Sequence, residues 1–133
     1  MQRVNVKVKG IVRCDDRILI IKHWYDDRIE DPYQWEFIDG NVDFGENPER
    51  AVLRIMNAGA GTECEISKIL YTWSNVVGCV HTVGICYGLI TKSQDILLSE
   101  EYNEYKWVKK TELADYIENR ALMDDVTKVL DLL

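Results

Sequence analysis

Carboxylates gather around one stretch of the chain, residues 34–62, and carboxylates are the side chains that could hold a hard metal ion. Four of them precede an expected helix: Glu36, Asp39, Asp43 and Glu46. Three more come from a later acidic loop: Glu100, Glu101 and Glu104. Oxygen ligands of this kind suit Mg²⁺, which can bind a diphosphate and activate water. A solvated acidic surface would show the same scattered residues, so the spacing leaves both interpretations open.

The segment from Gly40 to Thr62 resembles the motif of the Nudix hydrolase superfamily, G-x5-E-x7-R-E-U-x-E-E-x-G-U, in which U is an aliphatic residue. Five fixed positions of the motif match, at Gly40, Glu46, Arg54, Met56 and Gly61. The lead-in also matches, because family members usually carry an aromatic strand before a glycine turn, and residues 35–40 here read WEFIDG. The resemblance implies a Nudix fold of the α/β (α+β) class, a mixed β-sheet sandwiched between helices. It covers the whole chain, 1–133, as a single domain.

The match fails at the metal ligands. In the family, three carboxylates follow the arginine by one, four and five residues, share one side of a helix and converge on metal ions. Here those positions hold Ile55, Ala58 and Gly59, whose side chains have no oxygen, and Thr62 replaces the last aliphatic residue. The resemblance therefore implies that metal-dependent hydrolysis is lost or very weak. The expected cofactor is none, or weakly bound Mg²⁺.

Glu46 and Arg54 allow two interpretations. In the catalytic one, Glu46 contacts a metal ion and Arg54 orients it or binds a phosphate. In the structural one, which the sequence favours, the two side chains form an ion pair that ties the loop to the helix. If the site is active, the expected metal ligands are Glu46, Asp43 and Glu101, in a rearranged acidic site.

A bound ligand would need further contacts from this region and from aromatic side chains. The candidates for ligand binding are Glu36, Asp39, Gly40, Trp24 and Trp73. The two tryptophans could stack on a base, although aromatic residues on strands more often pack in a core. Positive charge could come from Lys22, His23, Arg28 or Lys68, and the sequence does not select among them.

Alternating and helical patterns predict the elements that would position these residues. Strands are expected over residues 4–13, 17–24, 34–38, 65–77, 79–91 and 105–108, with an acidic loop over 25–33. Asn47 as N-cap and Pro48 at the first helical position predict a helix from Pro48 to about Asn57, which Gly59 and Gly61 end. A short helix over 111–116, capped by Thr111, and an amphipathic helix over 122–133 complete the chain.

Composition and charge limit the classes of partner that the protein is expected to bind. The 133 residues fit one domain, and the net charge of −7 argues against a broad electrostatic grip on nucleic acid. No apolar run approaches the roughly 18 residues of a membrane span, and the first residues lack the apolar region of a signal peptide. The four cysteines form no CxxC pair. We therefore expect a cytoplasmic protein without nucleic-acid or membrane partners.

Three functions remain open. The first is a Nudix-fold protein that binds a nucleotide or another diphosphate-containing small molecule, with hydrolysis lost or very weak. The second is an active hydrolase that cleaves a nucleoside diphosphate-linked substrate through a rearranged acidic site. The third is a protein-interaction module, in which the C-terminal helix could form a homodimer surface instead of packing in the core.

Overall fold

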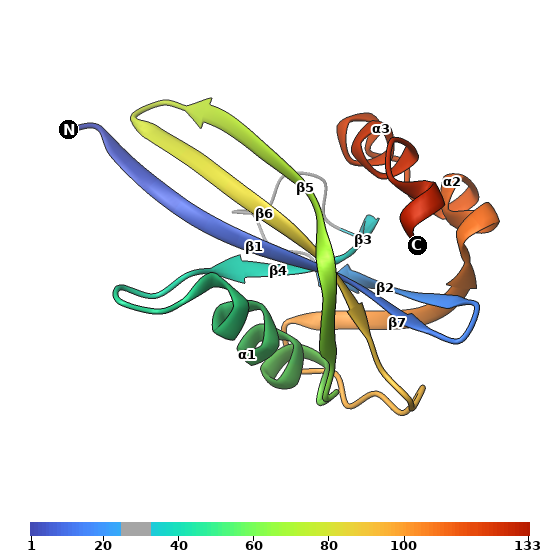
Figure 1. Cartoon of the computed structure of the whole chain (residues 1–133). Helices are drawn as coiled ribbons and strands as arrows, with labels where there is room; N and C mark the ends of the chain where they lie inside the picture. Colours follow the sequence, from blue (N-terminus) through green and yellow to red (C-terminus); the bar gives the residue numbers. More distant parts are fainter. Residues whose placement is uncertain (25–32) are drawn as a thin grey trace.

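The computed structural model describes residues 1–24 and 33–133 (Figure 1). The acidic loop expected over 25–33, and Arg28 within it, therefore lie outside the described residues except for Tyr33. The described strands are β1 (Arg3–Cys14), β2 (Arg17–His23), β3 (Trp35–Glu36), β4 (Ile38–Asn41), β5 (Glu65–Val77), β6 (Val80–Ile90) and β7 (Tyr102–Lys109). The described helices are α1 (Pro48–Ala60), η1 (Lys110–Glu112), α2 (Leu113–Tyr116), α3 (Arg120–Thr127) and η2 (Leu130–Leu132).

One mixed sheet contains all the described strands, in the order β3-β2-β1-β6-β5, with β4 also paired to β1 and β7 to β2. The pairing of β1 with β6 is parallel, and its pairings with β2 and β4 are antiparallel. In the β1–β4 ladder, Lys9 stands opposite Asp39 and Val8 opposite Gly40. This ladder places the start of the Nudix-like motif at the centre of the sheet.

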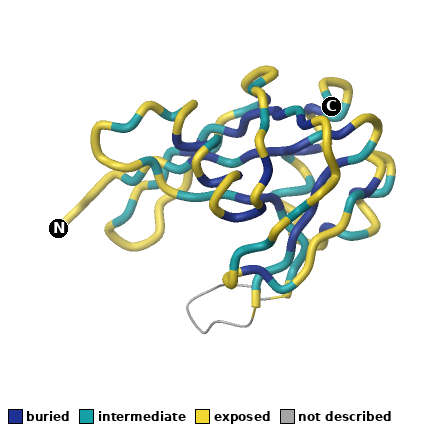
Figure 2. The backbone as a smooth tube through the Cα atoms, turned by 90° about the horizontal axis from the view of Figure 1, so that it is seen from below, coloured by how far each residue is buried: buried dark blue, intermediate teal, exposed yellow. Residues whose placement is uncertain are grey.

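Helices cover both faces of the sheet. Helix α1 lies on one face, and α2 and α3 lie on the other (Figure 1). The apolar run of β2 serves both sides, because Leu19 and Ile21 pack in the core under α1 while Ile18 and Ile20 pack in the core under α3. Figure 2 shows the buried residues in the middle of the molecule and the exposed N-terminal end of β1. The predicted architecture, a mixed sheet between helices, is confirmed.

Helix α1 begins as predicted and ends later than predicted. The Asn47 side chain accepts a hydrogen bond from the Glu49 N–H at 2.8 Å, and Pro48 occupies the first turn. The helix runs to Ala60, and only Gly61 takes the left-handed conformation, with φ of 61°. Gly59 is not a helix stop. It is buried inside the helix, where a Cβ atom would lie 3.0 Å from the Tyr102 ring.

Other boundaries differ because strand pairing, rather than local pattern, decides them. The strand predicted over 34–38 is two strands, since β3 pairs with β2 and β4 pairs with β1. The last strand is longer than the predicted 105–108, because β7 pairs along the whole of β2. The C-terminal helix predicted over 122–133 ends at Thr127 and resumes as the short η2.

The expected cap at Thr111 is also wrong. The Glu112 carboxylate, not the Thr111 hydroxyl, accepts a hydrogen bond from the backbone at this turn, from the Lys109 N–H at 2.9 Å.

No helix among the described residues is long and apolar enough to cross a membrane.

Candidate functional site

A cavity of about 310 Å³ opens where α1 meets the end of β4. Its walls come from β4 and the following loop, from α1, and from the start of β7. The lining residues are Asp39, Gly40, Asn41, Asp43, Arg54, Ile55, Ala58, Gly59, Glu101 and Tyr102. The cavity thus brings together the start of the motif, the later acidic loop and all three positions at which the motif lacks its carboxylates.

The α1 side of this cavity is apolar. Ile55 is 8% exposed and packs against Gly40, where a Cβ atom would lie only 2.9 Å from the isoleucine Cγ2. Ala58 is exposed at the mouth, and Gly59 is buried against Tyr102 and Ile38. Ile55 therefore faces the cavity, not the solvent on the opposite side of α1, as the alignment to the motif requires. At these three positions the helix offers a metal ion no side-chain oxygen.

Arg54 and Glu46 form a two-pronged ion pair beside the cavity. The guanidinium donates from Nε to Glu46 Oε2 at 2.8 Å and from Nη2 to Glu46 Oε1 at 3.0 Å. The same Nη2 donates to the Asn41 carbonyl at 2.9 Å, and the Asp43 N–H donates to Glu46 Oε1 at 3.0 Å. The hydrogen bond from Arg54 lowers the pKa of Glu46 to about 2, and Glu46 in turn raises the pKa of Arg54. The pair thus fastens the loop and the end of β4 to α1.

Three of the candidate acidic residues line the cavity: Asp39 in β4, Asp43 in the loop after it and Glu101 just before β7. Burial raises the pKa of Asp39, so this carboxyl resists ionisation more than an exposed aspartate does. Glu36, Glu100 and Glu104 do not line the cavity. Among the described residues, no group of three or more histidine, cysteine or acidic side chains is close enough to hold a metal ion. The residues described here therefore do not fit a Mg²⁺ site.

Glu36 instead pairs with a histidine. His23 Nε2 lies 2.8 Å from Glu36 Oε1, and the centre of the His23 ring lies 4.8 Å from that of the Tyr102 ring, with the two ring planes tilted by 49°. The hydrogen bond with Glu36 raises the pKa of His23. The sequence suggests His23 only as a possible positive charge and gives it no partner, because nothing in the local pattern shows that β3 pairs with the end of β2.

Neither of the two tryptophans proposed for base stacking lines the cavity, although the backbone N–H of Trp24 donates to the carbonyl of Glu101, which does. Trp24 follows β2 and is 51% exposed. Trp73 belongs to β5 and packs flat over Gly84, a position where any side chain would collide with the indole. The Lys9 ammonium lies 4.4 Å from the centre of the Trp73 ring, so this indole already has a cationic partner.

The model of the NUDIX domain family matches residues 1–128. The chain belongs to the Nudix family. Among curated proteins, it is similar to the nucleoside triphosphatase NudI of Escherichia fergusonii, at 27% identity over 130 residues, with 90% of this chain and 92% of that protein covered. The NudI protein of Escherichia coli O81 is 25% identical over the same share of both chains.

Solved structures show the same Nudix fold. The MutT protein from Methanosarcina mazei Go1 superposes with a TM-score of 0.82 at 18% identity, covering 98% of this chain and 95% of that one. A MutT Nudix hydrolase from Burkholderia pseudomallei gives 0.77 at 22% identity, covering 96% and 99%. The family and the fold expected from the sequence are confirmed.

Sequence reasoning missed two residues of this Nudix cavity. Asn41 contributes its backbone carbonyl to Arg54, and a backbone contact leaves no trace in side-chain chemistry. Tyr102 closes the cavity over Gly59. Tyr102 directly follows Glu101, which was predicted as a metal ligand, so the sequence pointed to the neighbouring residue.

Proposed function

We propose that this Nudix domain binds a nucleotide or another diphosphate-containing small molecule, and that its metal-dependent hydrolysis is lost or very weak. The observation that carries the proposal is the apolar wall of the cavity, formed by Ile55 and Ala58 at two positions where the motif places carboxylates. Metal-assisted hydrolysis needs several oxygen ligands already in place. The curated relatives are named nucleoside triphosphatases, which makes nucleoside triphosphates the first ligands to test.

Charge around the cavity indicates how such a ligand would lie. Arg54 is engaged by Glu46 and Asp43, and the negative charges of Asp43 and Glu101 repel a phosphate that enters without a metal ion. Lys7 and Lys9 do not line the cavity, because Val8 between them packs under α1 and the Lys9 ammonium lies over Trp73 on the other face of the sheet. We therefore expect the uncharged part of the ligand to lie against Ile55 and Ala58, with the phosphates pointing out of the cavity and away from the acidic residues.

Binding and turnover are measured separately. With metal chelated, calorimetry with ATP and GTP should show binding that Ala58→Glu weakens by about fivefold, because the change adds a negative charge to the cavity wall. The matched control is Ala114→Glu, which adds the same charge at an exposed alanine of α2. With Mg²⁺, product release from nucleoside triphosphates, dinucleoside polyphosphates and nucleotide sugars should be negligible.

A second candidate is an active hydrolase with a rearranged site. It is favoured by one observation, that Asp39, Asp43 and Glu101 reach the same cavity from separate segments. Robust Mg²⁺-dependent turnover that falls on Asp43→Asn and on Glu101→Gln would establish this candidate and refute the loss of hydrolysis. If no nucleotide binds with or without Mg²⁺, the ligand-binding proposal is wrong and the interaction module becomes the better hypothesis.

A further inference from the structure

A larger cavity, of about 470 Å³, lies at the other end of β1, on the α3 side of the sheet. Its floor is apolar and is formed by the ends of β1 and β6 and the start of β2, where Ile11, Leu89 and Ile18 are each 1% exposed. Leu132 and Leu133, at and beyond η2, form an apolar wall. Small-molecule pockets are commonly this size and mostly apolar.

The rim of this cavity is basic in a chain that is otherwise acidic. Arg13, Lys68, Lys109 and Lys110 line it, against only Asp15 and Asp16. The whole chain has the reverse balance, with 16 lysines and arginines and 23 aspartates and glutamates. A local reversal of charge around an apolar hollow is complementary to an anion that carries an apolar body.

Two of the four basic groups are available to such an anion. Lys110 is engaged, because its ammonium donates to the Leu130 carbonyl and to a main-chain oxygen of Leu133, the last residue of the sequence, at 3.3 Å each. Arg13 is partly engaged, through a 2.9 Å hydrogen bond from Nη1 to the Asp15 carbonyl. Within the described residues, the ammonium groups of Lys68 and Lys109 have no hydrogen-bond or ion-pair partner.

The acidic groups on the rim oppose an anion only weakly. The carboxylate of Asp16 lies 3.6 Å from Nε of Arg17, a cation that does not itself line the cavity. Asp15 is therefore the one rim acid whose carboxylate has no cationic partner among the described residues. The balance of free charge at the mouth is positive.

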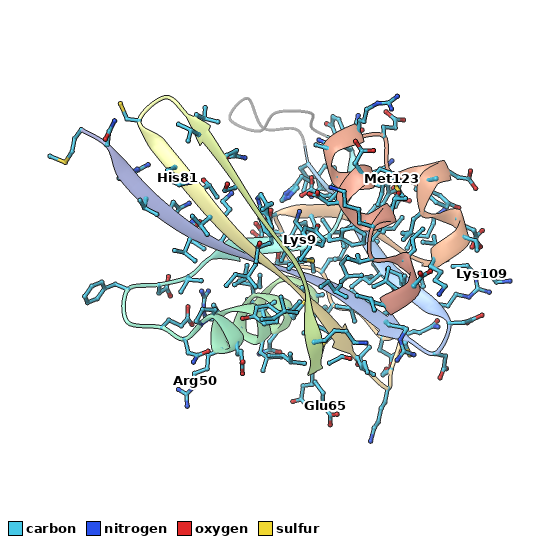
Figure 3. The ribbon with its side chains drawn as sticks, turned by 45° about the horizontal axis from the view of Figure 1, so that its top comes forward. Lys9, Arg50, Glu65, His81, Lys109 and Met123 are labelled. Carbon is cyan, nitrogen blue, oxygen red and sulfur yellow. The ribbon has the colours of Figure 1, made fainter. Side chains whose placement is uncertain are left out.

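We propose that this cavity is a second ligand site, which binds a small amphipathic anion: a carboxylate or phosphate head held between Lys68 and Lys109, with an aliphatic or aromatic body against Ile11 and Leu132. Figure 3 shows Lys109 at the β1–β2 hairpin end of the molecule and Arg50 on α1. The site shares no lining residue with the first cavity, the one between α1 and the end of β4, which we call the Gly40 cavity. It therefore does not depend on the function proposed above.

The test uses the whole chain and the eight-carbon probes octanoate, octyl phosphate, octanol and octylammonium. Calorimetry gives the affinities, and two-dimensional amide NMR locates the probe. Octanoate or octyl phosphate should bind at least about fivefold more tightly than octanol, and octylammonium more weakly still, because charged rim groups select the head. The affected amides should be those of residues 88–90 and 109–111, with residues 39–43 unchanged.

Variants separate the rim from charge in general. Lys68→Glu/Lys109→Glu should weaken octanoate binding by about tenfold, because the change reverses two charges on the rim. Both lysines are exposed, so the change leaves the core intact. Arg50→Glu, a reversal of an exposed charge on α1, should change it by less than about twofold. A preference for octyl phosphate over octanoate would identify a phosphate head, and the opposite preference a carboxylate.

Three results would overturn the proposal. One is equal affinity for octanoate and octanol. Another is equal weakening by the rim variant and by Arg50→Glu. The third is a set of shifted amides that maps to the Gly40 cavity. The wild-type chain supplies an independent check, because octanoate binding at the rim must weaken as salt rises while octanol binding stays unchanged.

Discussion

Two sets of positions on helix α1 line the same cavity and differ in how they match the Nudix motif. Arg54 keeps the motif residue and holds Glu46 and the Asn41 carbonyl. Ile55 and Ala58 stand where the motif has carboxylates. Every partner of Arg54 belongs to the chain itself, so the ion pair stabilises the loop without a metal ion. Clustered carboxylates, in contrast, repel one another unless a cation is present.

The three altered positions also differ among themselves. Ala58 is exposed, Ile55 is buried against Gly40, and Gly59 is buried beneath Tyr102. Two of the three positions are thus part of the core and one is open to solvent. A carboxylate should therefore cost more stability at Ile55 or Gly59 than at Ala58.

The largest effect is expected from Gly59→Glu. A Cβ atom there lies 3.0 Å from the Tyr102 ring, so the new side chain forces this tightly packed contact apart. Overpacking of this kind costs about 2 kcal/mol. Ala58→Glu, one residue away and exposed, should change the free energy of unfolding by less than about 0.5 kcal/mol. Urea denaturation of both variants measures the contrast, and equal effects would show that Tyr102 does not close over Gly59.

The second prediction concerns recovery of metal binding. Ile55→Glu/Ala58→Glu restores two carboxylates and leaves Gly59 unchanged, so that new oxygens face Asp43 and Glu101 across the cavity. Because Mn²⁺ and Mg²⁺ prefer several carboxylate oxygens, we expect Mn²⁺ affinity to rise by about tenfold or more over the parent. Calorimetry measures the affinity, after circular dichroism has shown that the variant is folded.

The matched control for this experiment is Ala114→Glu/Ala121→Glu. It adds the same charge at exposed alanines on the helices that cover the other face of the sheet. If the two double variants bind Mn²⁺ equally, general acidity explains the gain. In that case the register of the motif on α1 is wrong, or the loop has moved too far to complete a site.

Local sequence signals predicted the parts of the site that depend on local structure. The start of α1 follows from Asn47 and Pro48, and the strand pattern of residues 65–77 follows from alternation. The parts that were missed depend on partners distant in sequence. From sequence alone Gly59 is predicted to end the helix, but in the fold it is buried against Tyr102. Local sequence likewise gives His23 no partner, but strand β3 brings Glu36 beside it. The break between β3 and β4 likewise follows from two different partner strands, which no local pattern encodes.

The smallest expected effect tests whether the ion pair between Arg54 and Glu46 stabilises the fold. Arg54 lowers the pKa of Glu46 to about 2 in the folded chain, below its ordinary value of 4.5. A carboxylate with a lowered pKa stabilises the fold above its unfolded-state pKa, and that stabilisation is lost as the pH falls through the folded-state pKa. Glu46→Gln should therefore reduce the free energy of unfolding at pH 7, and the difference from wild type should shrink between pH 4.5 and pH 2. Urea denaturation across this range measures that difference.

In an Arg54→Ala background, the effect of Glu46→Gln on the free energy of unfolding should lose most of its pH dependence, because the partner that lowers the pKa is gone. If the pH dependence persists without Arg54, the hydrogen bond from the Asp43 N–H, and not the ion pair, holds Glu46 ionised and fastens the loop.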